Sequence, residues 1–430
     1  AMAGVINFIL KKSTDGTIVD VRYGDTTRGG GESFNITLTS GFERGNFSGI
    51  VGLELQSKEP LWGYERGIQN STLDAPTSRR RLPRLISQIY DWDDDVNIAP
   101  ADDCAAMSGL NEGTTALAED RYGEPYCGSD RAIAYRTIDN GRRGVNAYGS
   151  FEYYFDGGMS WFADVQLGRQ EVRLLTGTNG NDVVSDHMGW EFHDPLSTDN
   201  YREKMFYNQA SGHYEVWSRQ FSPEEVGGLT NRMNKTTQKT AAVTTGFKGS
   251  FAQDWNWEAA YNHSEYRADV DMPRIRAAAA NELFLGPLLG YDADGYAIYD
   301  ADHERMFRPI TPAQFATIGA MSTFRPVAKN DNVNFTVDTP ALFSMPAGDV
   351  GFAGVLEYGR QSYSINPDPL ALTDDAYYGP RYGDGDGSRN RWGAAGELRV
   401  PLLSSLQASL AGRYDRYSYG NKNPGKFTYS

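Results

Sequence analysis

Apolar and polar residues alternate in many segments of this chain. From Ser33 to Phe42, positions 34, 36, 38 and 42 are apolar, and the positions between them are mostly small or polar. A short turn, ERGN, follows, and the alternation resumes from Phe47 to Gln56. Because successive side chains of a strand point to opposite faces, this period of two predicts strands with one apolar and one polar face. Together the two segments predict an antiparallel hairpin.

The same arrangement returns along the chain. Tight turns between paired segments are predicted at residues 43–46, 156–158, 251–254, 346–349 and 402–405. The connections from one hairpin to the next are long, at about residues 60–143, 176–236, 273–330 and 367–388. The tight turns therefore fall on one side of the predicted sheet and the long connections on the other. Aromatic residues gather beside the tight turns: Phe42, Phe47, Phe155, Trp161, Phe251, Trp255 and Trp257.

This pattern favours an all-β fold of the transmembrane antiparallel β-barrel type. Membrane strands have about ten residues, alternate in polarity and carry aromatic residues at the membrane interfaces. Outer-membrane barrels have short periplasmic turns and long extracellular loops. A soluble β-sandwich also has alternating strands. Its core tolerates few polar residues, however, and in this chain one face of each predicted strand is polar, which favours the barrel. The polar face is expected to line the interior, through Glu54, Gln56, Glu152, Asp164, Gln166, Lys248, Glu258, Glu357 and Arg413.

The longest connection should not be wholly irregular. Loops of this length rarely lack structure of their own in an ordered protein. Residues 82–90 and 104–127 are therefore expected to fold into small helices or hairpins. Cys104 and Cys127 both lie in this connection. In an oxidising compartment they would form a disulfide, which stabilises by about 3 kcal/mol in the chain-entropy model; two unpaired buried thiols are the alternative.

Composition and charge narrow the classes of function. The 430 residues include 47 glycines, 26 tyrosines and 20 phenylalanines, which suits strands better than helices. No segment reaches the roughly 18 to 20 apolar residues of a membrane-spanning helix. The net charge of −15 disfavours a nucleic-acid partner, because phosphate neutralisation needs a basic face. The one dense basic cluster, residues 79–81, is interpreted as a solvated loop.

The first residues form a different pattern. In AMAGVINFILKK both faces of the run from Val5 to Leu10 are largely apolar, which predicts a strand buried on both sides and ended by two lysines. This segment resembles the closing strand of the plug domain in TonB-dependent outer-membrane receptors, which carries an Ala-x-x-Gly-Val-Ile-Asn pattern. The matching residues are Ala1, Gly4, Val5, Ile6 and Asn7. Residues 343–369 and 397–430 are similar to mid-barrel hairpins of the branch of that family with long outer loops.

The resemblance implies a barrel of about 22 strands closed around an N-terminal plug. Residues 1–12 would be the end of the plug and residues 17–430 the N-terminal half of the barrel, with about eleven strands and the start of another at residues 426–430. The chain would then be a fragment. The implied protein lies in the outer membrane of a Gram-negative bacterium, in contact with its lipid. It would import a scarce solute, such as a siderophore, vitamin, oligosaccharide or peptide, by plug gating coupled to a TonB-type complex.

Candidate chemistry is confined to the long connections. The sequence has no G-x-S-x-G elbow, no H-E-x-x-H and no phosphate-binding glycine loop, so no enzymatic activity and no resident cofactor are expected. Two clusters combine carboxylates with aromatic residues, which suits sugar or cationic ligands. They are Asp91, Trp92, Asp93, Asp94 and Asp95, and Asp292, Asp294, Tyr296 and Tyr299.

These clusters have less specific interpretations too. The D-x-D-G of the second cluster could bind calcium in an extracellular loop, but it lacks the later bidentate glutamate. Both clusters could be solvated, self-repelling loops. His187 and His193 form a near pair that could bind a metal or be exposed loop residues.

For the whole protein, a passive porin is the main alternative to the receptor, and a soluble β-rich surface enzyme or adhesin is the third hypothesis.

Overall fold

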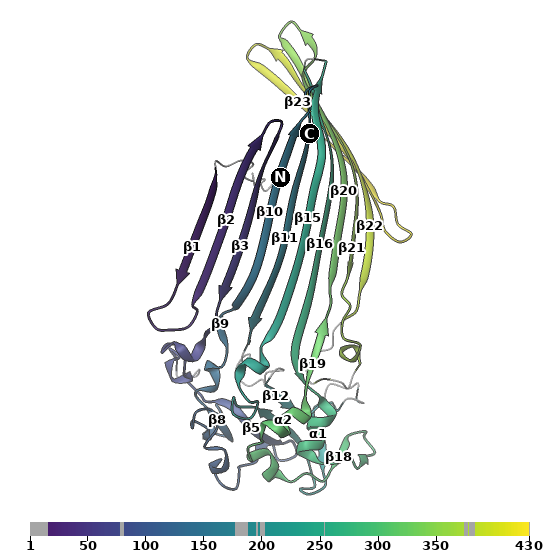
Figure 1. The fold of residues 1–430 in the computed structure, drawn as a ribbon. Coiled ribbons are helices and arrows are strands. Elements are labelled where there is room, and N and C mark those ends of the chain that lie inside the picture. Colours follow the sequence, from purple (N-terminus) through teal and green to yellow (C-terminus); the bar gives the residue numbers. More distant parts are fainter. Residues whose placement is uncertain are drawn as a thin grey trace.

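The structure is a computed structural model of the chain. It describes residues 16–77, 81–176, 188–194, 197, 203–252, 254–373, 377 and 383–429. The plug-like motif of Gly4, Val5, Ile6 and Asn7 lies outside the described residues, as do residues 79–80 and His187. Two bodies are visible in Figure 1: a tall, curved wall of strands and a smaller, mixed subdomain at one end of it.

The wall is an antiparallel sheet whose strands lie side by side in the order in which they occur along the chain. Its order is β1-β2-β3-β10-β11-β15-β16-β20-β21-β22-β23-β24, and β19 adds to the end of β16. The bounds are β1 Thr17–Gly24, β2 Ser33–Arg44, β3 Phe47–Lys58, β10 Gly141–Tyr154, β11 Met159–Leu174, β15 Asn234–Phe251, β16 Trp255–Ile275, β19 Gly319–Phe324, β20 Val327–Met345, β21 Gly348–Ser364, β22 Asp386–Leu403, β23 Leu406–Ser418 and β24 Gly425–Tyr429.

The expected hairpins are confirmed. Each predicted tight turn joins two paired strands: β2 to β3, β10 to β11, β15 to β16, β20 to β21 and β22 to β23. At the first of these turns Gly45 has a φ of 60°, a left-handed conformation that glycine adopts without strain. The strand expected near residue 426 is β24. The longest strand, β16, has 21 residues, about twice the length that a bilayer requires.

The register fixes two chemically different faces. Leu38 lies opposite Leu53, which lies opposite Ala147, and Ala147 faces Leu167 on the next strand. This face has large exposed apolar side chains, such as Leu167 at 52% and Leu356 at 59%. Asn35 and Asn146, on the opposite face, donate to the two carboxylate oxygens of Glu54 at 2.8 and 2.9 Å. On the polar face, side chains such as these satisfy one another's hydrogen-bonding groups. No part of the described chain covers the apolar face.

The long connections fold together into a second body, here called the cap subdomain. Its sheet has nine strands with the main order β17-β18-β13-β14-β5-β8-β7, to which β12 and β6 add. The bounds are β5 Arg84–Asp91, β6 Val96–Asn97, β7 Ala116–Glu119, β8 Pro125–Ser129, β12 Gly189–Glu191, β13 Phe206–Asn208, β14 His213–Gln220, β17 Gly290–Tyr291 and β18 Ala297–Tyr299, with β4 Leu61–Trp62 and β9 Thr137–Asp139 as a separate pair.

Short helices complete the described elements. The α-helices are α1 Ala277–Leu285 and α2 Pro312–Ile318, and the 3-10 helices are η1 Gly63–Glu65, η2 Thr72–Asp74, η4 Ala105–Met107, η5 Ala132–Ala134, η6 Leu229–Arg232, η7 His303–Phe307 and η8 Pro369–Leu372. Thr311 caps α2 by accepting a hydrogen bond from the backbone N–H of Gln314. No helix among the described residues is both long and apolar enough to cross a membrane.

The core of the cap subdomain draws on three separate connections. Ile86 and Ile89 come from the first, Trp190 and Trp217 from the second, and Phe284 from the third, and all are at most 1% exposed. The Trp190 and Phe284 rings stack with centroids 4.9 Å apart. Ordered structure was expected in part of the first connection. In the structure all three connections are folded, because each supplies an apolar surface that the other two bury.

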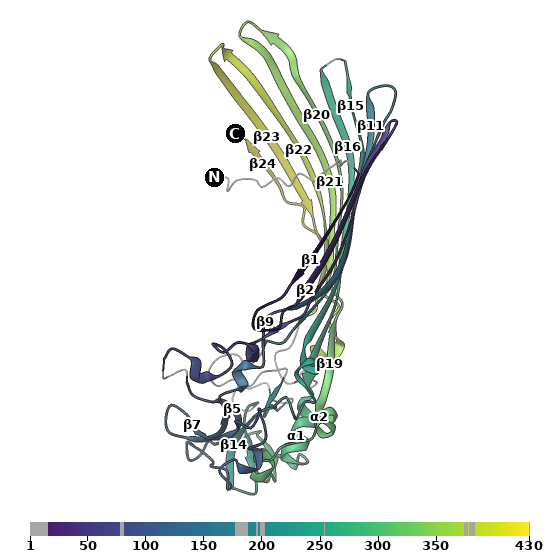
Figure 2. The same ribbon diagram turned by 60° about the vertical axis from the view of Figure 1, so that its left-hand side comes forward.

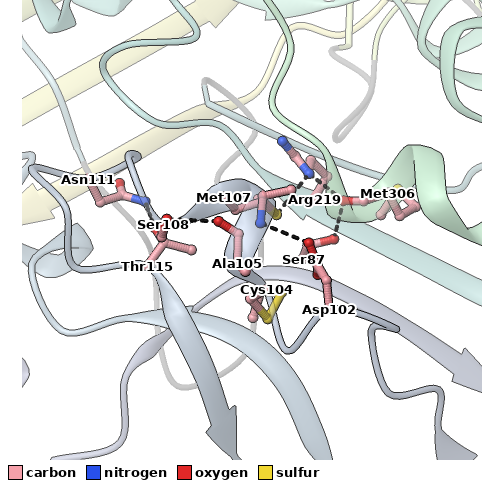
Figure 3. Close-up of a disulfide and its surroundings, with 12 residues drawn as sticks. Ser87, Asp102, Cys104, Ala105, Met107, Ser108, Asn111, Thr115, Arg219 and Met306 are labelled. Carbon is pink, nitrogen blue, oxygen red and sulfur yellow. Dashed lines mark hydrogen bonds between the residues drawn. A yellow bond between two sulfur atoms is a disulfide. The ribbon is translucent and has the colours of Figure 1, made fainter.

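A disulfide, shown in Figure 3, and a buried ion pair brace this core. Cys104 and Cys127 are bonded, with their Cα atoms 5.8 Å apart and both side chains inaccessible. Arg219 is buried and pairs with the buried carboxylate of Glu225. The backbone carbonyl of Met306 accepts from Arg219 and, at 2.6 Å, from the Ser87 hydroxyl. Residues of all three connections therefore meet at this point.

Candidate functional site

A large cavity lies on the polar face of the wall. Its volume is about 1020 Å³, and its lining comes from β11, β15, β16, β20, β21 and β22 and from the residues that follow β23. Gly387 and Tyr363 place it near the strand ends from which the long connections leave. Figure 2 shows the cap subdomain beneath the concave side of the wall.

Aromatic and hydrogen-bonding groups make up much of the lining. Arg389 donates from Nε to the Gln361 side-chain oxygen at 2.7 Å, and the Gln361 amide donates to Asn330 at 3.1 Å. The lining includes Tyr266 and Tyr363, and Tyr363 is 56% exposed. An arginine fixed by a hydrogen bond can donate to an anionic group, and exposed tyrosine rings can stack on a planar or cyclic ligand. The cavity is therefore suited to a polar, partly aromatic or sugar-like solute.

The first acidic cluster is a hydrogen-bonded turn at the end of β5. One carboxylate oxygen of Asp91 accepts from the backbone N–H groups of Asp93 and Asp94 at 3.0 and 3.2 Å. Its other oxygen lies 2.6 Å from Nδ1 of His213. Asp93 accepts from the backbone N–H of Tyr214 at 2.9 Å. The cluster thereby ties the turn after β5 to the start of β14.

The second acidic cluster reaches the same point from the other side. One oxygen of Asp292 accepts from the backbone N–H groups of Asp294 and Tyr296, both at 2.9 Å. Its other oxygen accepts from the Tyr214 hydroxyl at 2.6 Å. The ring of Tyr296 lies 4.9 Å from that of Tyr214. Two clusters that the sequence separates are thus joined through Tyr214.

These contacts shift the pKa values of the groups involved. The Asp91 carboxylate raises the pKa of His213 above 6.5. Burial alone would raise the pKa of Asp91, but its hydrogen bonds, first that with His213, hold it below 3.8. The hydrogen bond to Asp292 raises the pKa of Tyr214, and the hydrogen bond to Asp95 raises the pKa of Tyr90 to about 12. At neutral pH Asp91 and Asp292 are ionised, and the Tyr214 hydroxyl donates to Asp292.

Not every proposed ligand residue is accessible. Trp92 is 46% exposed beside the edge of Tyr90, so it could contact a ligand. Asp95 accepts from the Tyr90 hydroxyl. The prediction that Tyr299 contacts a ligand is corrected by its burial. Tyr299 is 6% exposed and packs against Phe192 and Phe206 in the core. Tyr299 lies in β18, and its side chain points into the cap subdomain. The loop sequence carries no sign of this strand.

Calcium binding at Asp292 stays a prediction. Both of its oxygens accept hydrogen bonds from within the protein, whereas calcium takes six to eight oxygen ligands. Ligand atoms of Asp91, Asp93 and His213 lie within 4.8 Å of one another. The carboxylate oxygens in this group also accept from backbone N–H groups, and these contacts explain the arrangement as a fastened turn.

Only part of these sites could be predicted from the sequence. Gln166 was expected on the interior face, and it lines the cavity. Arg389 and Tyr363 were missed, although their positions in alternating strands would have assigned them to the polar face. His213 and Tyr214 were missed as well. The segment HYEVWSRQ has no distinctive motif, so the sequence carries no signal of their role as a link.

Comparisons with known proteins give limited similarity. No protein-family model and no curated protein matches the sequence. Among solved structures, a point mutant of the ferric enterobactin receptor of Pseudomonas aeruginosa has a TM-score of 0.44 and 11% identity, over 97% of this chain and 42% of that chain. A second mutant of that receptor, in complex with enterobactin, has a TM-score of 0.43 and 10% identity, over the same shares.

The β domain of the Bordetella autotransporter BrkA has a TM-score of 0.23 and 9% identity, over 93% of this chain and 87% of that domain. The chain therefore spans about two fifths of the length of the receptor chains to which it is similar.

Proposed function

We propose that this chain is part of a TonB-dependent outer-membrane receptor that captures a scarce solute and admits it by energy-coupled gating. One observation carries the proposal: a tall two-faced sheet has a cavity on its polar side and a folded cap at the end from which its long connections leave. The apolar side suits lipid, the polar side suits a water-filled path, and the cap suits selection of the solute.

The apolar face supports the membrane part of the proposal. Large apolar side chains are exposed on strands from β1 to β24, including Val21, Leu53, Leu167, Val333 and Phe427. A soluble protein rarely leaves so extended an apolar surface uncovered. Beside the tight turns, the rings of Phe42 and Phe47 lie 5.3 Å apart, and those of Phe251 and Trp255 lie 5.7 Å apart. Such aromatic residues suit the membrane interface.

The cavity supports the solute part of the proposal. Its volume of about 1020 Å³ is at the upper end of the usual range for small-molecule sites. Tyr266, Tyr363 and Arg389 offer stacking and hydrogen bonds to a solute of siderophore, vitamin, oligosaccharide or peptide type. Gating would need only a change of conformation and no covalent step by these residues.

The test is uptake by the full-length protein in outer membranes, with candidate solutes and with or without a protonophore. Uptake that stops with the protonophore supports the receptor. Uptake that continues without the proton motive force would establish a passive porin instead. A product that is soluble without detergent would contradict the membrane assignment altogether.

Two variants test the cavity itself. Arg389→Gln and Tyr363→Ala are expected to weaken solute binding by roughly tenfold each, from the loss of a charge-assisted hydrogen bond and a stacking surface. Asn390→Ala is the matched control, because its side chain points to the opposite face of β22. Equal binding by all three variants would exclude this cavity as the solute site.

A further inference from the structure

A second cavity opens where the wall meets the cap subdomain. Its volume is about 400 Å³, and it lies at the ends of β3, β10 and β11, beside the start of β15 and the end of η6. The residues that line it include five cationic ones, Lys58, Arg142, Arg143, Arg173 and Lys235, and three acidic ones, Glu59, Glu171 and Asp271. Arg142 and its register partner Lys58 lie on the opposite strand face from Arg143. This cationic excess stands out in a chain whose net charge is −15.

The acids of this cavity neutralise it only in part, and Lys58 is paired with Asp139 outside the lining. Glu171 is shared: one oxygen lies 2.6 Å from Arg173 and the other 3.3 Å from Lys235. Arg143 pairs with Glu59 at 2.7 Å, and 55% of the Arg143 side chain remains exposed. Each guanidinium has five N–H donors, so these arginines keep donors for a further anion.

The position of the cavity relates it to the apolar face. Arg143 is two residues from Val145 on β10, so both side chains point to the same face, and Val145 is 38% exposed. Leu167 is 52% exposed and shares its face with Arg169, Glu171 and Arg173 on β11. Two residues of a strand span about 7 Å. On β10 Arg143 therefore lies about 7 Å beyond Val145, and on β11 Arg173 lies about 20 Å beyond Leu167.

We propose that this cavity binds the phosphate of a membrane-lipid headgroup whose acyl chains lie on Val145 and Leu167. Arginine pairs with phosphate through two parallel hydrogen bonds, and lysine supplies a point charge. Basic side chains next to a membrane's apolar zone attract anionic headgroups in this way. The inference rests on the proposed membrane embedding, and it adds a lipid-binding site outside the solute path.

The test measures lipid that stays bound to the full-length protein purified in detergent. The protein is incubated with mixed micelles that contain phosphatidylglycerol and an uncharged lipid of the same chain length, washed, and analysed by mass spectrometry. The variant combines Arg143→Gln, Arg173→Gln and Lys235→Gln. The control combines Arg44→Gln, Arg121→Gln and Arg308→Gln, which removes the same charge from positions that do not line the cavity.

We expect the cavity variant to retain at least about tenfold less phosphatidylglycerol than the wild type, with retention of the uncharged lipid unchanged. Equal losses in variant and control would overturn the site, because they would reflect net charge alone. Displacement of the lipid by millimolar inorganic phosphate would assign the cavity to a free anion and overturn the lipid source. A protein that retains neither lipid contradicts the membrane embedding as well, whereas failed uptake with intact lipid retention contradicts only the transport proposal.

Discussion

Tyr214 donates its hydroxyl proton to Asp292 at 2.6 Å, across 78 positions of the chain. Its backbone N–H donates to Asp93 of the first connection. One residue at the start of β14 therefore fastens the turn after β5 and the turn between β17 and β18. Small contacts at turns hold the three connections of the cap subdomain in register, in addition to the shared apolar core.

Replacing Tyr214 by phenylalanine tests this link. Tyr214→Phe removes one hydrogen bond to a partly exposed carboxylate, and we expect a loss of about 1 kcal/mol in the stability of the cap subdomain. Hydrogen exchange of the backbone N–H groups of Asp294 and Tyr296 would measure it, since both depend on the position of Asp292. Tyr122→Phe, at a tyrosine that is 75% exposed, is the control. Unchanged exchange in Tyr214→Phe would mean that the turn is fixed without this contact.

The pair of His213 and Asp91 predicts a pH dependence. The pKa of His213 is raised above 6.5, so its stabilisation is complete below pH 6.5 and is lost as the pH rises through the folded-state value. The pKa of Asp91 is lowered below 3.8, so its stabilisation is present above pH 3.8 and is lost as the pH falls through the folded-state value. The turn after β5 should therefore be most stable between about pH 3.8 and 6.5.

Hydrogen exchange of the Asp93 and Asp94 backbone N–H groups as a function of pH checks this window, after correction for the intrinsic rate. His213→Gln should abolish the loosening on the alkaline side. A variant that keeps the same alkaline loosening would assign it to another group.

The disulfide should stabilise the first connection. Cys104→Ala with Cys127→Ala removes a cross-link between two inaccessible residues, at an expected cost of about 3 kcal/mol. Limited proteolysis should then cut between η4 and β8 at protease levels that leave the wild type intact. The exposed substitution Ser108→Ala is a control for the general effect of mutation in this segment. Equal resistance of the double variant would show that packing around Met107 alone maintains the fold.

The two faces of the wall should respond differently to a charge. Leu53→Arg and Phe352→Arg place a cation on the apolar face, which costs about 2 to 4 kcal/mol near the middle of a bilayer. Both variants are expected to reduce assembly of the full-length protein in outer membranes. Gln166→Arg, on the polar face, should assemble normally. Heat-dependent migration in gels and surface protease protection measure assembly, and indistinguishable behaviour of the three variants would contradict the assignment of faces.

The strands of the wall could be predicted because their information is local. Each strand repeats a period of two, and turns such as residues 45–46 follow directly from the break in that period. The polarity of the wall could be predicted in the same way. Glu54 and Gln166 were assigned to the polar face from the alternation alone, and the register places both there.

The cap subdomain could not be predicted because its information is distributed. Trp190 gains its burial from Phe284 and a hydrogen bond from its indole N–H to Asn281, both in another connection. Tyr299 reads as one more tyrosine in an acidic loop until Phe192 and Phe206 cover it. Local pattern shows which residues are apolar, but not which distant segment will bury them.

The interleaving of the cap strands has a consequence for how the protein is made and how it can change. Ser87 bonds to Met306 across 219 positions, so the first connection must wait for the third to be synthesised before its polar and apolar groups are satisfied. Contacts between residues this distant in sequence slow folding. Until the third connection is available, the first connection keeps an exposed apolar surface that can aggregate. For the same reason natural variation should exchange the three connections as one unit, because a single foreign connection would bring an apolar surface that its neighbours do not match.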